Sequence, residues 1–138
     1  MKLKKIIISA LILAFLGAFI GYKIYNKPHV NVATEKADVV LSADQILADF
    51  TTDEAVANAK YLEKIIQVKG IVSETKIENN TGIIILQTND DFATILCHLT
   101  PQETKNISKI KKGRQITLKG ICTGFLMDVV LVKCVITN

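Results

Sequence analysis

The sequence predicts a mainly β domain of about a hundred residues, preceded by one helix long and apolar enough to cross a membrane. Two observations carry this prediction. Seventeen consecutive uncharged residues, 6–22, follow three lysines near the start of the chain. From Lys64 onward, hydrophobic residues recur at every second position, the period of a half-buried strand. The chain therefore divides into residues 1–25 as a membrane anchor or signal peptide, 26–36 as a linker, and 37–138 as the folded domain.

The apolar run is close to the length that a bilayer requires. As a helix its seventeen residues span about 25 Å of a hydrocarbon core about 30 Å thick, and snorkelling of Lys23 lets the apolar body extend to Tyr25. A cleaved signal peptide is the alternative. Its small-residue cleavage site is poor, because Leu16 and Phe19 flank the small residues between them. We therefore expect an uncleaved signal-anchor with a single transmembrane helix.

Charge predicts the orientation of this anchor. Three lysines and the α-amino group precede the apolar run, whereas Lys23 and Lys27 follow it. The positive-inside bias places the N-terminus in the cytoplasm. The folded domain is then periplasmic or extracellular, on the inner or plasma membrane. Residues 26–36 are polar, include Pro28 and show no sustained period, so they are expected to form a tether.

The net charge of +4 belongs to the anchor rather than to the domain. Six of the seventeen bases but only one of the thirteen acids precede residue 37, which leaves eleven bases and twelve acids in the domain. A nearly neutral domain of this kind weakens the case for a polyanionic partner such as nucleic acid.

Two short helices are expected at the start of the domain. Ser42 followed by Gln45 forms a capping-box pattern and predicts a helix from Ala43 to about Phe50. The acids of Thr52-Asp53-Glu54 suit a helix N-terminus, and the helix they begin ends near Tyr61.

Alternation then predicts five strands, separated by turns rich in Asn, Asp and Gly. They span residues 64–72, 83–87, 93–99, 115–123 and 128–136. Gly70 within the first strand indicates a bend or bulge of the kind that closes a small barrel. The side chains expected to face inward are Ile66, Val68, Gly70, Val72, Ile95, Cys97, Leu99, Ile116, Leu118, Gly120, Cys122, Val130, Val132, Cys134 and Ile136.

A third helix is expected between the third and fourth strands. Thr100 at the N-cap, Pro101 at the first position and Glu103 form a strong helix start, and the helix should end near Lys111 to Gly113. Three strands, a helix and two strands, with glycines at bends, is the order of a five-stranded OB-fold Greek-key barrel. A Greek-key sandwich is the alternative, but it requires more strands.

Four short segments resemble the tRNA-anticodon-like OB-fold family, small bacterial proteins that are often membrane-anchored or exported. They are residues 57–61 (ANAKY), 68–72 (VKGIV), 118–125 (LKGICTGF) and 129–131 (VVL). The resemblance covers roughly residue 37 to the C-terminus and implies the OB fold. It implies nucleic-acid binding only by fold analogy, and it identifies no contact residue.

The three cysteines all fall on inward positions, as small apolar core residues usually do. Outside the cytoplasm one disulfide is permitted, and strand order allows Cys134 to pair with Cys97 or with Cys122. A metal site is not expected, because the adjacent Cys97 and His98 point to opposite faces of one strand.

The remaining candidates for a binding function are polar or aromatic side chains outside the core. Outward strand positions and turn aromatics define a candidate ligand face of Gln67, Lys69, Phe92, Thr94, His98 and Phe125. Five cations lie near the end of the third predicted helix, at Lys105, Lys109, Lys111, Lys112 and Arg114. A solvated helix face explains them simply, and contact with an acidic partner or a membrane surface is the alternative.

No nucleophile motif, phosphate loop, catalytic carboxylate pair or zinc-helix motif is present in the sequence. We therefore expect no enzyme and no cofactor. The expected function is that of a membrane-anchored binding module of the bacterial cell envelope, with an envelope protein, a glycan or a small ligand as partner. The alternatives are a single-stranded nucleic-acid binder, for tRNA or oligonucleotides, and an enzyme that uses a free cysteine.

Overall fold

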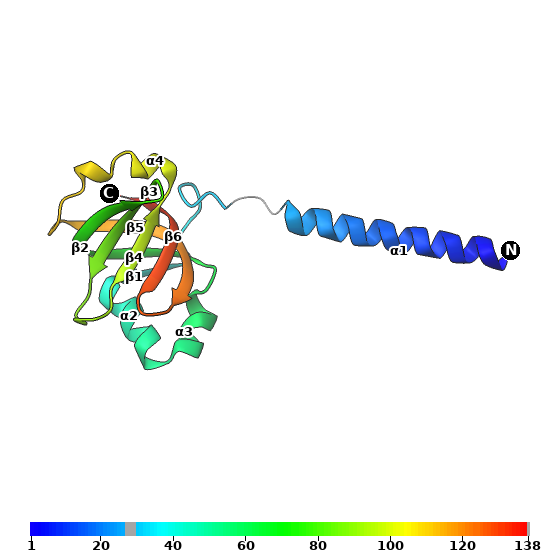
Figure 1. Ribbon diagram of the computed structural model, residues 1–138. Coiled ribbons are helices and arrows are strands. Elements are labelled where there is room, and N and C mark those ends of the chain that lie inside the picture. The colour runs from blue at the N-terminus through cyan, green and yellow to red at the C-terminus, as the bar shows by residue number, and fades with distance from the viewer. Residues whose placement is uncertain (27–29, 138) are drawn as a thin grey trace. The chain divides into compact units, whose positions relative to one another are not determined.

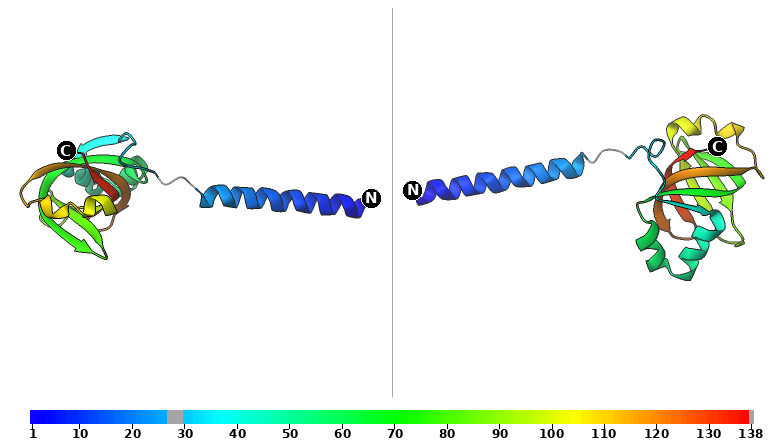
Figure 2. Two further views of the ribbon diagram at one scale, coloured as in Figure 1. Left: turned by 90° about the horizontal axis from the view of Figure 1, so that it is seen from above. Right: turned by 180° about the vertical axis from the view of Figure 1, so that it is seen from behind.

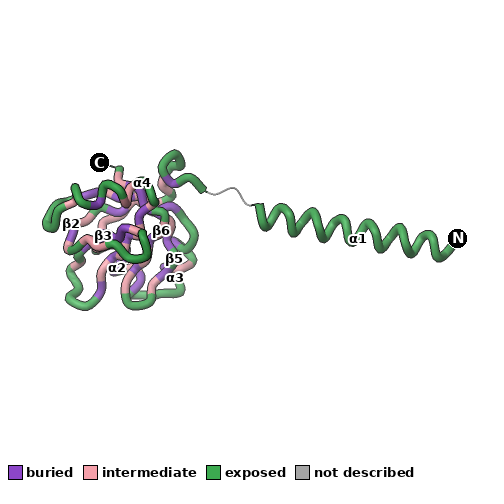
Figure 3. Tube along the Cα trace, turned by 45° about the horizontal axis from the view of Figure 1, so that its top comes forward, coloured by how far each residue is buried: buried purple, intermediate pink, exposed green. Residues whose placement is uncertain are grey.

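The computed structural model describes residues 1–26 and 30–137, and the chain forms two compact units, Met1–Val30 and Asn31–Asn138 (Figure 1). Helix α1 (Lys2–Tyr25) is exposed along its whole length (Figure 3). Its length and composition are sufficient to cross a membrane. Residues 27–29 of the predicted linker, which include Lys27 and Pro28, lie outside the described residues.

The second unit contains a closed barrel of five strands. They are β2 (Ile65–Glu78), β3 (Thr81–Gln87), β4 (Ile95–Leu99), β5 (Gln115–Phe125) and β6 (Val129–Ile136). The strand order is β2-β3-β4-β6-β5, and pairing of β2 with β5 closes the barrel. Strands β4 and β6 are parallel, and the other barrel pairs are antiparallel. The predicted five-stranded OB-fold barrel is confirmed.

Strand β2 closes the barrel because it is long enough to pair with two different strands, β5 and β3. Its first half, Ile65 to Ile71, pairs with β5, and its second half pairs with β3. The expected bend near Gly70 is present as a bulge between Val72 and Glu74. A Cβ on Gly70 would lie 3.1 Å from the Leu86 side chain, so the inner wall is tight at this point.

The inward alternation is confirmed on β4 and β5 and on the first half of β2, where Gly70 alone is half-buried. On β6 the prediction is wrong for Val130 and Val132, which are half-exposed, whereas Val129 and Leu131 are fully buried. The reason is a bulge at Lys133, whose φ is +52°. The extra residue shifts the inward-facing positions by one. Alternation counted back from the buried Cys134 therefore places Val132 and Val130 on the wrong face of β6.

Both predicted N-terminal helices are present at one end of the barrel, as α2 (Ala43–Thr52) and α3 (Glu54–Tyr61) (Figure 1). The capping box is complete, with Ser42 N donating to Gln45 Oε1 at 2.9 Å and Gln45 N donating to Ser42 Oγ at 3.2 Å. Helix α2 buries Ile46, Leu47 and Phe50 against the barrel core.

The helix between β4 and β5 is shorter than predicted. It consists of α4 (Pro101–Thr104) and a 3₁₀ turn, Ile107–Lys109. Between Lys105 and Lys112 only Ile107 and Ile110 are apolar, so a longer helix would bury little. The Thr104 hydroxyl instead accepts a 2.9 Å hydrogen bond from Gly82 N, which holds α4 against the start of β3.

A sixth strand, β1 (Val39–Ser42), was not predicted; it pairs in parallel with the first half of β2. The residues before it also pack on the barrel unit. Val32 is 3% exposed against Ile65 and Val135, and Lys119 Nζ donates to the Glu35 carbonyl at 2.7 Å. Thus 31–36, predicted as linker, contacts the outer barrel wall.

We expect Gly120→Val to lower the free energy of unfolding by about 3 kcal/mol, because overpacking of a filled core is costly. The added Cβ would overlap Cys134 Sγ and lie 3.1 Å from the Val132 carbonyl oxygen. Urea denaturation followed by circular dichroism measures the loss. Lys69→Ala, at an exposed position of β2, is the control and should change stability by less than about 0.5 kcal/mol. Equal losses at the two positions would contradict this packing.

Candidate ligand-binding face

An aliphatic surface crosses the outer face of β3, β4 and β6. The strand registers place Ile85 opposite Leu96, and Leu96 opposite Val130. These three side chains are half-exposed, and Ile83, 3% exposed, lies beside them outside the core cluster. We call Ile83, Ile85, Leu96, Val130 and Val132 the outer aliphatic strip. OB-fold barrels commonly bind ligands on the face of these central strands.

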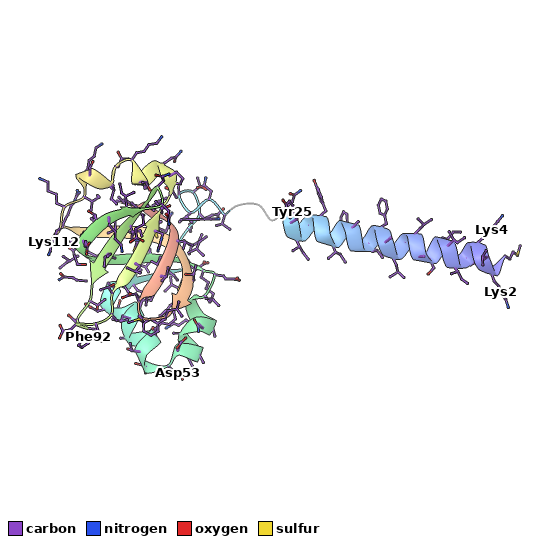
Figure 4. All side chains as sticks on the ribbon, in the orientation of Figure 1. Lys2, Lys4, Tyr25, Asp53, Phe92 and Lys112 are labelled. Atoms are coloured by element: carbon purple, nitrogen blue, oxygen red, sulfur yellow. The ribbon has the colours of Figure 1, made fainter. Side chains whose placement is uncertain are left out.

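Three large apolar side chains extend from the loops at the α2–α3 end of the barrel. Phe92 in the β3–β4 loop is 92% exposed, and Leu126 and Met127 in the β5–β6 turn are 90% and 77% exposed. Asp128 Oδ1 accepts hydrogen bonds from the backbone N and the hydroxyl of Thr94, at 2.7 and 2.8 Å, which brings the two loops together. We call Phe92, Leu126 and Met127 the apolar loop tip; Figure 4 labels Phe92.

Hydrogen bonds hold the loop tip in place. Asp90 Oδ1 accepts from the backbone N of Phe92 at 2.7 Å and from that of Ala93 at 3.1 Å. Ala93, the residue after Phe92, is 7% exposed and packs in the core cluster, so burial fixes the loop next to Phe92. The exposed Phe92 ring therefore stands on an ordered loop.

A groove adjoins the loop tip between α3 and the β5–β6 turn. Its volume is about 340 Å³, and its apolar lining comes from Leu62, Phe125, Leu126 and Val130. Because Val130 also belongs to the outer aliphatic strip and Leu126 to the loop tip, the groove joins the strip to the tip; Glu54, Asn58 and Thr123 supply its polar lining.

The charges close to this surface are mostly acidic. Asp90 and Asp91 precede Phe92, Asp128 follows Met127, and Glu54 lines the groove. Along β2, the same outer side carries Glu74, Lys76 and Glu78 next to β3. Lys76 and Glu78 form a 2.7 Å ion pair, and their hydrogen bond raises the pKa of Lys76 and lowers that of Glu78.

The structure brings three of the six predicted ligand-face residues onto this side of the barrel. Phe92 belongs to the loop tip, Thr94 holds its two loops together, and His98 pairs with Ile83 beside the strip. Gln67 and Lys69 lie elsewhere, on the half of β2 between β1 and β5.

Phe125, the sixth residue, is half-buried rather than free. Its ring stacks on that of Phe50 of α2, with centroids 5.8 Å apart. Phe125 therefore packs against α2 and also lines the groove. Sequence reasoning missed Leu126 and Met127, which lie between the fourth and fifth predicted strands. Two consecutive large apolar residues in a turn were the signal that could have found them.

The three cysteine thiols are free and fully buried. Burial raises the pKa of Cys122, and burial together with a hydrogen bond to Cys97 raises the pKa of Cys134. Cys97 and Cys134 are therefore neighbours, and the disulfide of Cys134 with Cys97 or with Cys122 stays a prediction for the oxidised protein. Within residues 1–26 and 30–137, no group of His, Cys, Asp or Glu side chains is placed to hold a metal ion.

A hydrogen-bonded group of Asp49, Lys60 and Tyr61 links α2 to α3. The Tyr61 hydroxyl donates to Asp49 Oδ2, and Lys60 Nζ lies 3.4 Å from the same oxygen. The hydrogen bond from Tyr61 lowers the pKa of Asp49, and burial raises the pKa of Tyr61. Tyr61 is fully buried against Phe50, so this group fastens the helix pair.

The closed five-stranded barrel, with a helix between β4 and β5, defines an OB-fold protein. The model of the tRNA_anti-like family matches residues 1–136, and the chain belongs to that family. No curated protein sequence matches this chain.

Solved structures support the fold assignment. One is a lipoprotein of Klebsiella pneumoniae to which nucleic-acid binding is provisionally ascribed; it has 16% identity, covers 72% of this chain and 92% of its own, and gives a TM-score of 0.60. An aspartyl-tRNA synthetase, provisionally so assigned, from Leishmania major has 11% identity, covers 88% of this chain and 25% of its own, and gives a TM-score of 0.50. At such identities the likeness shows the fold alone.

We expect all three thiols of the native protein to react with iodoacetamide at least about tenfold more slowly than in the urea-unfolded chain, because buried thiols are inert. The raised pKa values of Cys122 and Cys134 keep both sulfurs protonated at mildly alkaline pH. Mass spectrometry of timed samples at pH 8 measures the rates. One thiol that reacts rapidly in the folded protein would instead favour the alternative of a cysteine-dependent enzyme.

Proposed function

We propose that this protein is a membrane-anchored, non-catalytic OB-fold binding module of the cell envelope, whose partner is a protein or peptide. The observation that carries the proposal is the apolar loop tip, where three large side chains are 77–92% exposed on hydrogen-bonded loops. Such exposure costs solvation and is uncommon on monomers, unless the residues are covered in a complex.

The surface has the composition of a protein-binding site. A large aromatic ring, a methionine and aliphatic side chains form its centre, and acidic residues form part of its rim. Aromatic residues and Met are enriched in interface cores, where a few of them supply most of the binding energy. The acids Asp90, Asp91, Asp128 and Glu54 favour a partner with apolar anchors and a basic rim.

Helix α1 supports placing this module at a membrane, with the barrel unit on the outer side as the lysine bias predicts. The similar Klebsiella structure is named a lipoprotein, which agrees with an envelope location. The absence of a catalytic motif from the sequence supports binding without chemistry. The groove beside the loop tip could seat one side chain of the partner, since its volume is about 340 Å³.

Single-strand nucleic-acid binding is the second candidate function. The family and the provisional name of the Klebsiella protein favour it. Proteins that bind single strands through an OB fold combine a basic groove with stacked aromatic rings. Here one exposed ring, Phe92, stands among acids, so this face suits a nucleic acid poorly.

The test uses the full-length chain in nanodiscs and a displayed library of random peptides. We expect selected peptides to combine apolar residues with Lys or Arg, and the triple variant Phe92→Ser/Leu126→Ser/Met127→Ser to bind them at least about tenfold more weakly, as expected when interface anchors are removed. The matched control is Ile77→Ser, which removes a 58% exposed apolar side chain from the second half of β2. Equal loss with the control, or no selection above background, would refute the proposed surface.

A salt-titrated binding assay with single-stranded DNA and RNA oligonucleotides distinguishes nucleic-acid binding from the proposed protein binding. We expect weak binding with no dependence on the loop-tip residues. Micromolar or tighter affinity that falls steeply as salt rises would overturn the ranking in favour of nucleic acid.

A further inference from the structure

A small polar pocket lies on the barrel unit where β2 passes from one partner strand to the next. Strand β1 pairs with β2 as far as Lys69, and β3 pairs with β2 from Ile71 onward. The start of α2 borders this gap, at the end of the barrel where α2 and α3 lie together (Figure 2). The pocket has a volume of about 280 Å³ and shares no lining residue with the groove beside the loop tip.

We call this cavity the amide pocket, because side-chain carboxamides supply much of its lining. The lining residues that matter for its chemistry are Asp44, Lys69, Ile71, Gln87, Asn89 and Gln115.

Strand pairing and hydrogen bonds hold the walls of the amide pocket. Ile71 pairs with Gln87 of β3 on one side and with Gln115 of β5 on the other, so the three side chains form one row across the sheet. The backbone N of Asn89 donates to Asp44 Oδ1 at 2.7 Å, which joins the β3–β4 loop to the start of α2. Ordered walls of this kind are typical of small-molecule sites, which are largely pre-formed.

The polar side chains around the pocket are not used by the fold. The side chains of Lys69, Gln87, Asn89 and Gln115 form no hydrogen bond or ion pair with another residue that the structure describes. Each carboxamide offers an acceptor oxygen and two N–H donors, and the Lys69 ammonium offers three donors. Three carboxamides and one ammonium around a single cavity are therefore available to a ligand.

The charges and apolar groups of the pocket limit the class of ligand. Asp44 and Lys69 are the ionisable residues of the lining, and their charges cancel, so neither an anion nor a cation is favoured. No aromatic ring lines the cavity, so a nucleic-acid base lacks a stacking platform. The exposed part of Ile71, 37% of the residue, gives a small aliphatic floor. A neutral ligand rich in hydroxyl groups matches this lining, because each hydroxyl both donates and accepts.

We propose that the amide pocket binds one ring of a neutral carbohydrate. Gln87, Asn89 and Gln115 exchange hydrogen bonds with its hydroxyl groups, the Asp44 carboxylate accepts from a hydroxyl, and Ile71 contacts the C–H face of the ring. The cavity volume of about 280 Å³ lies just below the range of about 300–1,000 Å³ that is usual for drug-sized ligands, which suits a single ring. The proposed function concerns a protein partner at the loop tip, so this inference adds a second ligand at a separate site.

Saturation-transfer-difference NMR on the full-length protein in nanodiscs tests the proposal, with glucose, galactose and N-acetylglucosamine as probes and empty discs as the background. We expect at least one sugar to bind with a dissociation constant on the order of 1 mM, the range of a small ligand held by a few hydrogen bonds. Inorganic phosphate should not compete. No saturable signal with any of the three sugars would overturn the proposal, and so would displacement of the sugar by phosphate.

A matched pair of variants locates the sugar. Gln87→Ala/Gln115→Ala should weaken binding at least about tenfold, because it removes two of the three carboxamides. The control Gln102→Ala removes an exposed carboxamide from α4 and should leave binding unchanged. Circular dichroism checks that both variants fold. Equal affinity in the two variants would overturn the assignment to this pocket.

The loop-tip triple variant separates this proposal from the proposed function. Phe92→Ser/Leu126→Ser/Met127→Ser should keep sugar binding, and Gln87→Ala/Gln115→Ala should keep binding of the selected peptides. Loss of sugar binding in the loop-tip variant would place the sugar at the loop tip and overturn the inference.

Discussion

The double pairing of β2 is the constraint on which the rest of the structure depends. One strand can pair with β5 and then with β3 only if it bends sharply between the two halves. Gly70 lies where the inner wall is tight, and the bulge after Val72 completes the turn. Closure pairs β2 with both β5 and β3, and it places β3, β4 and β6 side by side with a shared outer face. On that face Ile85, Leu96, Val130 and Val132 of the aliphatic strip stay half-exposed, whereas Ile83 is buried.

The fold was predictable because its signals are local and repeated. Alternation located the barrel strands, and Ser42, Asp53 and Thr100 located the helix starts. Alternation fails where one residue is inserted, as at Lys133, because a bulge with positive φ has no sequence signal in a lysine. Strand β1 was missed for a different reason. Four residues are too few to show a period, and its pairing with β2 is a tertiary contact.

The candidate site was only partly predictable, because its residues come from elements far apart in the chain. Thr94 and Asp128 are separated by 34 positions, yet their hydrogen bonds join the two loops of the tip. Nothing in either loop predicts that contact. The exposure of Leu126 and Met127 is likewise a property of the closed barrel, since a turn residue can fold back onto the core or point away. Phe125, one position earlier, folds back onto Phe50.

The domain is nearly neutral overall, but charges of one sign gather in two parts of its sequence. Asp90, Asp91 and Asp128 lie in the loops that carry the apolar loop tip, and five exposed cations lie within residues 105–114. Neither group stabilises the fold, because like charges within each group repel one another. A fold under selection for stability alone would be expected to mix the signs. For the acidic group beside the loop tip, the basic rim of the proposed partner would offset this repulsion.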